Sequence, residues 1–60
     1  MITINIYHDN KLEKTFENQE NDFNAFKWML NHQGQSIDWA IKYEGWKVEV
    51  IDEKGRRTYW

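Results

Sequence analysis

The chain contains no cysteine, and this absence constrains its fold more than any other feature of the sequence. A chain of 60 residues buries only about 60% of the surface that its unfolded form exposes, so small domains commonly add disulfides or a metal. The only histidines, His8 and His32, are far apart and lack the spacing of metal ligands. We therefore expect no metal and no other cofactor, and a core that closes by packing alone. Four tryptophans, three tyrosines and three phenylalanines can supply the bulk for it.

The first segment alternates apolar and polar residues, which predicts a strand with one buried face formed by Ile2, Ile4 and Ile6. If residues 8–10 form a three-residue loop with Asn10 left-handed, Ile6 lies opposite Leu12 and Ile2 lies opposite Phe16. A two-residue loop would instead place the polar Glu13 opposite Ile6. We therefore expect the three-residue loop, with a second strand over residues 12–17.

The end of the chain predicts a second hairpin by the same argument. With residues 53–55 as the loop and Gly55 left-handed, Val50 lies opposite Thr58 and Val48 opposite Trp60. That register places Trp60 on the core face of the sheet. It also sets Arg56 opposite Asp52 and Arg57 diagonal to Glu49, so each arginine has a carboxylate within cross-strand reach.

Between the hairpins, a helix is predicted to begin at Asn21 or Asp22 and to end at Gly34. Its apolar residues recur at spacings of three and four, and we expect them to form the buried stripe: Phe23, Phe26, Met29 and Leu30. Trp28 lies off this stripe, so it is expected to flank the core or to face outward.

Residues 36–44 fit two different structures. As a helix, the segment begins at the cap Ser36, ends at Gly45 and buries one stripe, formed by Ile37, Ala40 and Ile41. As a strand, it alternates cleanly through Ile37, Trp39, Ile41 and Tyr43. A strand would require a tight turn with Glu44 in a conformation that suits glycine, so the helix is favoured.

The predicted fold is therefore a single small α+β domain over residues 1–60, in which a β-hairpin, two helices and a second β-hairpin follow one another. The helices should cover one face of an antiparallel sheet. The alternative is a hairpin, one helix and a three-stranded meander. Because the chain has no proline, no repeat and no linker-like segment, we expect a complete domain.

No pattern of residues indicates an enzyme. The only serine, Ser36, is explained as a helix cap, and the three glycines are isolated rather than grouped in a phosphate-binding loop. No acidic residue lies in an apolar context that would raise its pKa for acid–base catalysis. The chain also has no segment that resembles a signal peptide or a membrane span, so a cytoplasmic location is expected.

The abundance of aromatic residues favours a non-enzymatic protein-binding module. The rings exceed what one core of this size easily hides, and tryptophan and tyrosine dominate contact energies at interfaces. The expected exposed patch is formed by Trp28, Trp39 and Tyr43. The composition is typical of small accessory proteins of phages and mobile elements, and it favours a regulator or inhibitor that acts by contact. A homodimer, or a larger homo-oligomer, formed through this patch or through a free strand edge, is an alternative.

A nucleic-acid-binding regulator of winged-helix type is the remaining alternative. The two helices would be followed by a wing that presents basic residues at its tip, namely Lys54, Arg56 and Arg57. The formal net charge is −2, and the second helix carries Asp38 and Glu44 against one lysine. Because such a helix would not be attracted to phosphates, binding to nucleic acid is the less favoured interpretation.

Overall fold

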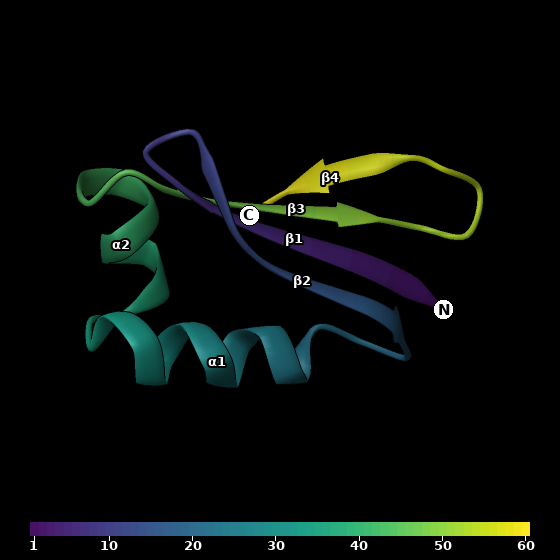
Figure 1. Cartoon of the computed structure of the whole chain (residues 1–60), viewed down its shortest axis with the longest axis horizontal. Coiled ribbons are helices and arrows are strands. Elements are labelled where there is room, and N and C mark those ends of the chain that lie inside the picture. Colours follow the sequence, from purple (N-terminus) through teal and green to yellow (C-terminus); the bar gives the residue numbers. More distant parts are fainter.

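Four strands and two helices follow one another in the order ββααββ in the computed structural model, which describes residues 1–60. They are β1 (Ile2–His8), β2 (Lys11–Gln19), α1 (Phe23–Gln33), α2 (Ile37–Tyr43), β3 (Trp46–Ile51) and β4 (Arg57–Tyr59). Both helices lie on one side of the sheet, with α2 at a steep angle to α1 (Figure 1). The predicted α+β fold is confirmed, including the helix at residues 36–44, so the alternative three-stranded meander is wrong.

The sheet is antiparallel, with the strand order β2-β1-β3-β4. β1 is an inner strand, and the alternation of apolar and polar side chains along it determines which face of the sheet is buried. Ile4 pairs with Val50 and Ile6 pairs with Val48, and both isoleucines are fully buried beneath the helices. The predicted burial of this face of β1 is therefore confirmed.

The turn between β1 and β2 contains two residues, so the expected three-residue loop is wrong. Asp9 has φ of +51° and Asn10 has φ of +67°, and two consecutive left-handed residues are typical of a type I′ hairpin turn. The predicted left-handed conformation of Asn10 is confirmed. A three-residue loop would bury the apolar residues of β2 only if the pairing with β1 were unbroken, whereas β2 contains a bulge.

The bulge accommodates Glu13 as an extra residue between the pairs Tyr7–Leu12 and Ile6–Lys14. Beyond it, Ile4 rather than Ile2 lies opposite Phe16, and Phe16 packs against the core. Before it, Leu12 lies opposite Tyr7 on the outer face of the sheet, where the leucine is 53% exposed. The predicted pairs Ile6–Leu12 and Ile2–Phe16 are therefore wrong.

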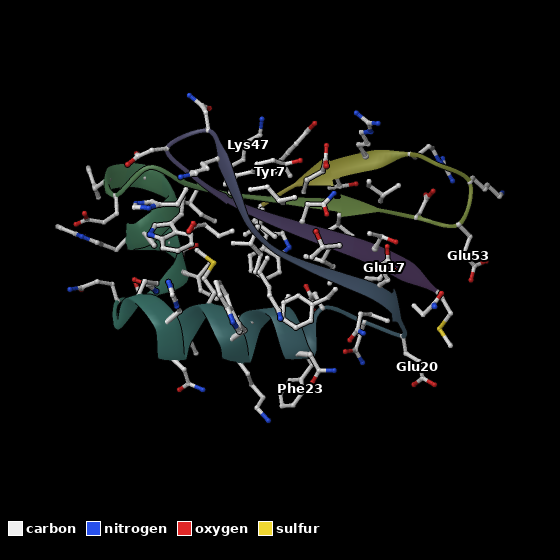
Figure 2. All side chains as sticks on the ribbon, viewed as in Figure 1. Tyr7, Glu17, Glu20, Phe23, Lys47 and Glu53 are labelled. Carbon is white, nitrogen blue, oxygen red and sulfur yellow. The ribbon has the colours of Figure 1, made fainter.

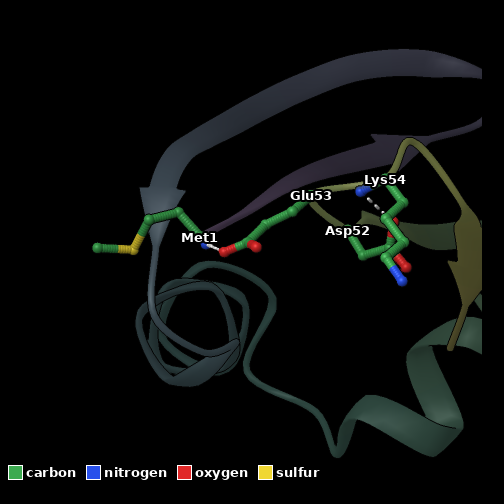
Figure 3. Close-up of polar contacts among 4 residues, drawn as sticks. All are labelled: Met1, Asp52, Glu53 and Lys54. Atoms are coloured by element: carbon green, nitrogen blue, oxygen red, sulfur yellow. Dashed lines mark hydrogen bonds and ion pairs between the residues drawn. The ribbon is translucent and has the colours of Figure 1, made fainter.

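The C-terminal hairpin has the predicted register. Val50 pairs with Thr58, and the Trp60 amide donates a hydrogen bond of 3.1 Å to the Val48 carbonyl oxygen. Gly55 has φ of +84°, as the loop requires. Within the loop, the Lys54 amide donates to the Asp52 carboxylate at 2.9 Å, and the neighbouring Glu53 contacts the amino group of Met1 (Figure 3).

Side chains define the beginning of both helices. The Asn21 carboxamide oxygen accepts a hydrogen bond of 2.9 Å from the Phe23 amide, whereas the side chain of Asp22 makes no capping bond. The Ser36 hydroxyl accepts one of 3.3 Å from the Trp39 amide, which confirms Ser36 as the cap of α2. Neither helix has the length and apolar character needed to cross a membrane.

The core lies between the helices and the inner strands. Its buried apolar side chains come from β1, α1, α2 and β3, and they are Ile4, Ile6, Ala25, Met29, Ala40, Trp46 and Val48. Phe16, Trp28 and Trp60 are partly buried and pack against this cluster. Because few apolar side chains are fully buried, much of the apolar surface of the protein stays exposed to solvent.

Candidate functional site

Helix α1 has two adjacent apolar faces, and only one of them faces the sheet. Ala25 and Met29 are fully buried. Phe23, Phe26 and Leu30 are 60%, 43% and 38% exposed. The expected buried stripe of four residues is therefore wrong except for Met29. The helix is rotated relative to that expectation because Trp28, instead of the phenylalanines, packs inward against the rings of Phe16 and Trp46.

The exposed face of α1 borders a groove that α2 and the end of the chain complete. Residues of α2 form its second wall, and Trp60 closes it beside Phe26, with ring centroids 6.4 Å apart. The cavity has a volume of about 510 Å³. We call it the helix groove, and its apolar lining consists of Phe26, Leu30, Ile37, Ile41 and Trp60.

Polar residues form the rim of the helix groove: Asp22, Ser36 and Asp38. The hydroxyl of Ser36 already accepts the capping bond from Trp39. Asp22 and Asp38 are both exposed, and neither makes an ion pair within 4.0 Å. The groove therefore combines an uncovered apolar floor with negative charge at its edge.

The predicted patch residues do not form one surface. Trp39 and Tyr43 lie on one side of α2 with ring centroids 4.6 Å apart, and they are 49% and 65% exposed. Their predicted exposure is confirmed, and their role in binding stays a prediction. Successive residues on a helix differ in direction by about 100°. The Trp39–Tyr43 pair and the groove-facing Ile41 therefore lie on different sides of α2, with the buried Ala40 between them.

Trp28 belongs to a different aromatic cluster, on the sheet side of α1. Its indole stacks on His32 with ring centroids 4.5 Å apart and meets Trp46 edge-on at 6.4 Å. On the other side of the cluster, Trp46 stacks on His8 at 4.3 Å. Trp28 flanks the core, which is one of the two predicted positions. No ring contact links it to Trp39 or Tyr43.

The basic residues of the proposed wing are largely engaged within the hairpin. Arg56 forms an ion pair of 3.3 Å with Asp52, and Arg57 forms one of 3.8 Å with Glu49. Both predicted pairings are confirmed. Only Lys54, at the tip of the loop, has no ion-pair partner. The hairpin thus presents little free positive charge, as the predicted pairing of both arginines implies.

The outer face of the sheet carries a row of hydrogen-bonded polar residues. The Thr15 hydroxyl donates to the Asn5 oxygen at 2.9 Å, and the Asn5 amide donates to Glu49 at 3.1 Å. The Tyr59 hydroxyl donates to the second Glu49 oxygen at 3.0 Å. The row therefore crosses all four strands. Figure 2 shows that Tyr7 and Lys47 also lie on this outer side, whereas Phe23 points away from the sheet.

This row shifts the pKa of both of its ionisable groups. The hydrogen bond from Asn5 is the main reason that the pKa of Glu49 lies below its ordinary value, although burial acts in the opposite direction. The hydrogen bond to Glu49 raises the pKa of Tyr59. Each shift favours the protonation state that these groups have near neutral pH, so the hydrogen bonds of the row stabilise the sheet at that pH.

The two sheet edges differ in the backbone that they expose. β2 is long, but it is interrupted by the bulge at Glu13 and by a second register shift near Asn18, which has φ of +55°. β4 contains only three residues. Irregular and short edges are poor templates for pairing with another strand. The predicted alternative of association through a strand edge therefore has little regular backbone available to it.

The chain shows no match to known protein-family models, to curated proteins or to solved structures. No group of three or more histidine, aspartate or glutamate side chains is arranged to hold a metal ion.

The apolar residues of the groove were not predicted as a site because the sequence pattern assigned each of them to the core. The number of apolar residues on α1 exceeds what one face of a helix can bury. It indicates that some of them stay exposed, but it does not show which ones.

Proposed function

We propose that this protein is a small protein-binding module that acts as a regulator or inhibitor by contact, and that the helix groove is its contact surface. The observation that carries the proposal is the concave apolar lining between α1, α2 and Trp60. Concave apolar surface of this kind is typical of sites that receive the anchoring side chains of a partner.

The groove is better suited to this role than the pair formed by Trp39 and Tyr43. Those two rings contact each other, so part of their apolar area is already covered. The Trp39 indole N–H donates to Glu44 at 3.2 Å, so its polar group is also engaged. In contrast, the groove offers a cavity between two helices. Binding energy concentrates where an anchor residue fills such a pocket.

Site-specific photo-crosslinking tests the proposal. One variant carries p-benzoylphenylalanine in place of Phe26, inside the groove. The matched control carries it in place of Tyr43, which is the more exposed of the two aromatic residues. Each variant is irradiated in a lysate of the cells that produce the protein. Circular dichroism first establishes that both variants fold like the parent.

We expect a discrete protein adduct from the Phe26 position and none, or much less, from the Tyr43 position. An adduct only at Tyr43 would assign binding to the Trp39–Tyr43 pair instead. Equal, diffuse labelling at both positions would show that exposure alone determines the reaction. Either result would reject the helix groove as the contact surface.

A further inference from the structure

We infer that the occupant of the helix groove is an amphipathic helix of another protein, with lysine or arginine residues beside its apolar stripe. This inference rests on the proposed function and specifies the class of partner. Two independent observations support it. One is the spacing of the exposed apolar residues on α1, and the other is the charge at the rim of the groove.

The exposed stripe on α1 has the geometry of a helix-packing surface. Phe23, Phe26 and Leu30 are separated by three and four residues, so they form one exposed stripe along the axis. Phe26 and Leu30 line the helix groove, and Phe23 extends the stripe beyond it. At 1.5 Å per residue, the stripe is about 10 Å long. Side chains at such spacings on one helix pack against those of a second helix. In helix-in-groove recognition, the bound helix presents its own apolar residues at positions i, i+3, i+4 and i+7.

The wall formed by α2 restricts how a partner can approach. Ile37 and Ile41 are one turn apart and face the same cavity as Leu30. A helix that lies along α1 would therefore place one flank of its apolar stripe against α2 and Trp60. This arrangement favours a partner with a broad apolar face over a partner with a single anchoring residue.

The rim determines the preferred charge of the partner. Asp22 and Asp38 line the groove, and no basic residue does. Lys42 borders an adjoining cavity four residues after Asp38, but the two form no ion pair within 4.0 Å. Lys27 lies over the ring of Phe23, with 5.4 Å between its nitrogen and the ring centroid. Lysine or arginine on the partner would complement the two free carboxylates.

A second copy of the chain fits the groove less well. In a symmetric dimer through this surface, the same patch of each subunit meets its own copy. The acidic rim of one subunit, with Asp22 and Asp38, would then lie at the same interface as the acidic rim of the other. Like charges at a contact are unfavourable, so the rim disfavours self-association through the groove.

The test uses two synthetic peptides of about 15 residues, which is near the minimum length for an isolated helix. Both have leucines at spacings of three and four residues. The remaining charged positions are all lysine in one peptide and all glutamate in the other. Each peptide is titrated into the ¹⁵N-labelled protein, and chemical-shift changes locate the site and give the dissociation constant. Spectra of the protein alone, recorded over a range of protein concentrations, reveal self-association as a change in chemical shifts.

We expect the lysine peptide to shift the amides of Leu30, Ile37 and Ile41 and the indole signal of Trp60. Its dissociation constant should be about tenfold lower than that of the glutamate peptide, because lysine gains an ion pair at each rim carboxylate whereas glutamate meets a like charge there. Asp22→Asn with Asp38→Asn should reduce this ratio to about 2 or less. The matched control, Glu13→Gln with Glu17→Gln on β2, removes the same charge and should leave the ratio unchanged.

Two outcomes would overturn the inference and leave the proposed function intact. One is equal binding of both peptides in the groove, and the other is a shift of the groove signals with protein concentration alone. If neither peptide binds, or if the shifts lie elsewhere on the surface, the inference falls as well. The crosslinking experiment then decides separately whether the groove contacts any protein.

Discussion

The side-chain amide of Asn5 on β1 donates a hydrogen bond of 3.1 Å to the carboxylate of Glu49 on β3. Glu49 is only 7% exposed, and its second oxygen is bonded by Tyr59. A carboxylate at such a position is acceptable because each of its oxygens has a donor. This relationship connects an inner pair of strands to the short β4.

Stability is expected to fall on acidification below about pH 4.5. The pKa of Glu49 in the folded protein is lowered from 4.5, chiefly by the bond from Asn5, so folding favours the ionised form. Its contribution is fully present above pH 4.5 and is lost as the pH falls through the lowered folded-state pKa. Asp52 should add a loss below pH 3.8, because the amide of Arg56 lowers its pKa.

Urea unfolding at a series of pH values measures this dependence. Glu49→Gln should flatten the decline that begins near pH 4.5 and should leave the component from Asp52 in place. Glu17→Gln, on the exposed part of β2, is the control and should leave the profile unchanged. An identical acid profile for Glu49→Gln and the parent would show that the hydrogen-bonded row does not couple folding to pH.

The two-residue turn predicts a clear order among substitutions at Asn10. Its φ of +67° is readily adopted by glycine, so Asn10→Gly should change the free energy of unfolding by no more than about 0.5 kcal/mol. Asn10→Val should cost about 1–2 kcal/mol, because a β-branched residue is strained in the left-handed region. Chemical unfolding of both variants measures the difference. Equal stability of the two would contradict the turn conformation.

Gly45 should be the most sensitive of the glycines. Its φ is +79°, and an added methyl group would collide with the carboxylate of Asp9. Gly34 has a similar φ of +74° but has open space where a Cβ would lie. Gly34→Ala should therefore cost about 1 kcal/mol and Gly45→Ala more, because the second also displaces Asp9. Thermal unfolding under identical conditions compares them, and the reverse order would reject the contact.

Trp60→Ala should destabilise the domain by about 2–3 kcal/mol, somewhat less than truncation of a fully buried ring. Trp60 is partly buried, packs against the core and contacts Phe26, so its removal exposes apolar surface. The total stability of a domain this small is of the order of 5 kcal/mol. Trp39→Ala, which truncates a tryptophan outside the core, should cost under about 1 kcal/mol. A Trp60→Ala variant that unfolds like the parent would contradict this role.

The C-terminal hairpin was predictable because the position of Gly55 determines the length of its loop and hence its register. Gly55 is suited to the left-handed position, and Val48 and Val50 identify the face that must be buried. The N-terminal hairpin was not predictable by the same rule. Because of the bulge at Glu13, the length of the loop no longer determines which residues of β1 and β2 pair beyond it. No glycine or proline marks the position of the bulge in the sequence.

The helix groove was not predictable because α1 has apolar residues on more than half of its circumference. Periodicity shows that Phe23, Phe26 and Leu30 share a side of the helix, but it does not show which side packs on the sheet. That choice depends on partners distant in the sequence. Phe16 and Trp46 pack against Trp28 and so determine the rotation of the helix.

Because of the position of Trp60, binding in the helix groove should change the thermal stability of the protein. The same ring packs on the core and closes the helix groove, so any occupant that holds it in place is thermodynamically linked to folding. A ligand at 100 times its dissociation constant adds about 2.7 kcal/mol to the stability of the bound form. In a domain of this size, that corresponds to a rise in melting temperature of about 10 °C or more. Candidate partners can therefore be ranked by thermal shift, without a label and before their cellular role is known.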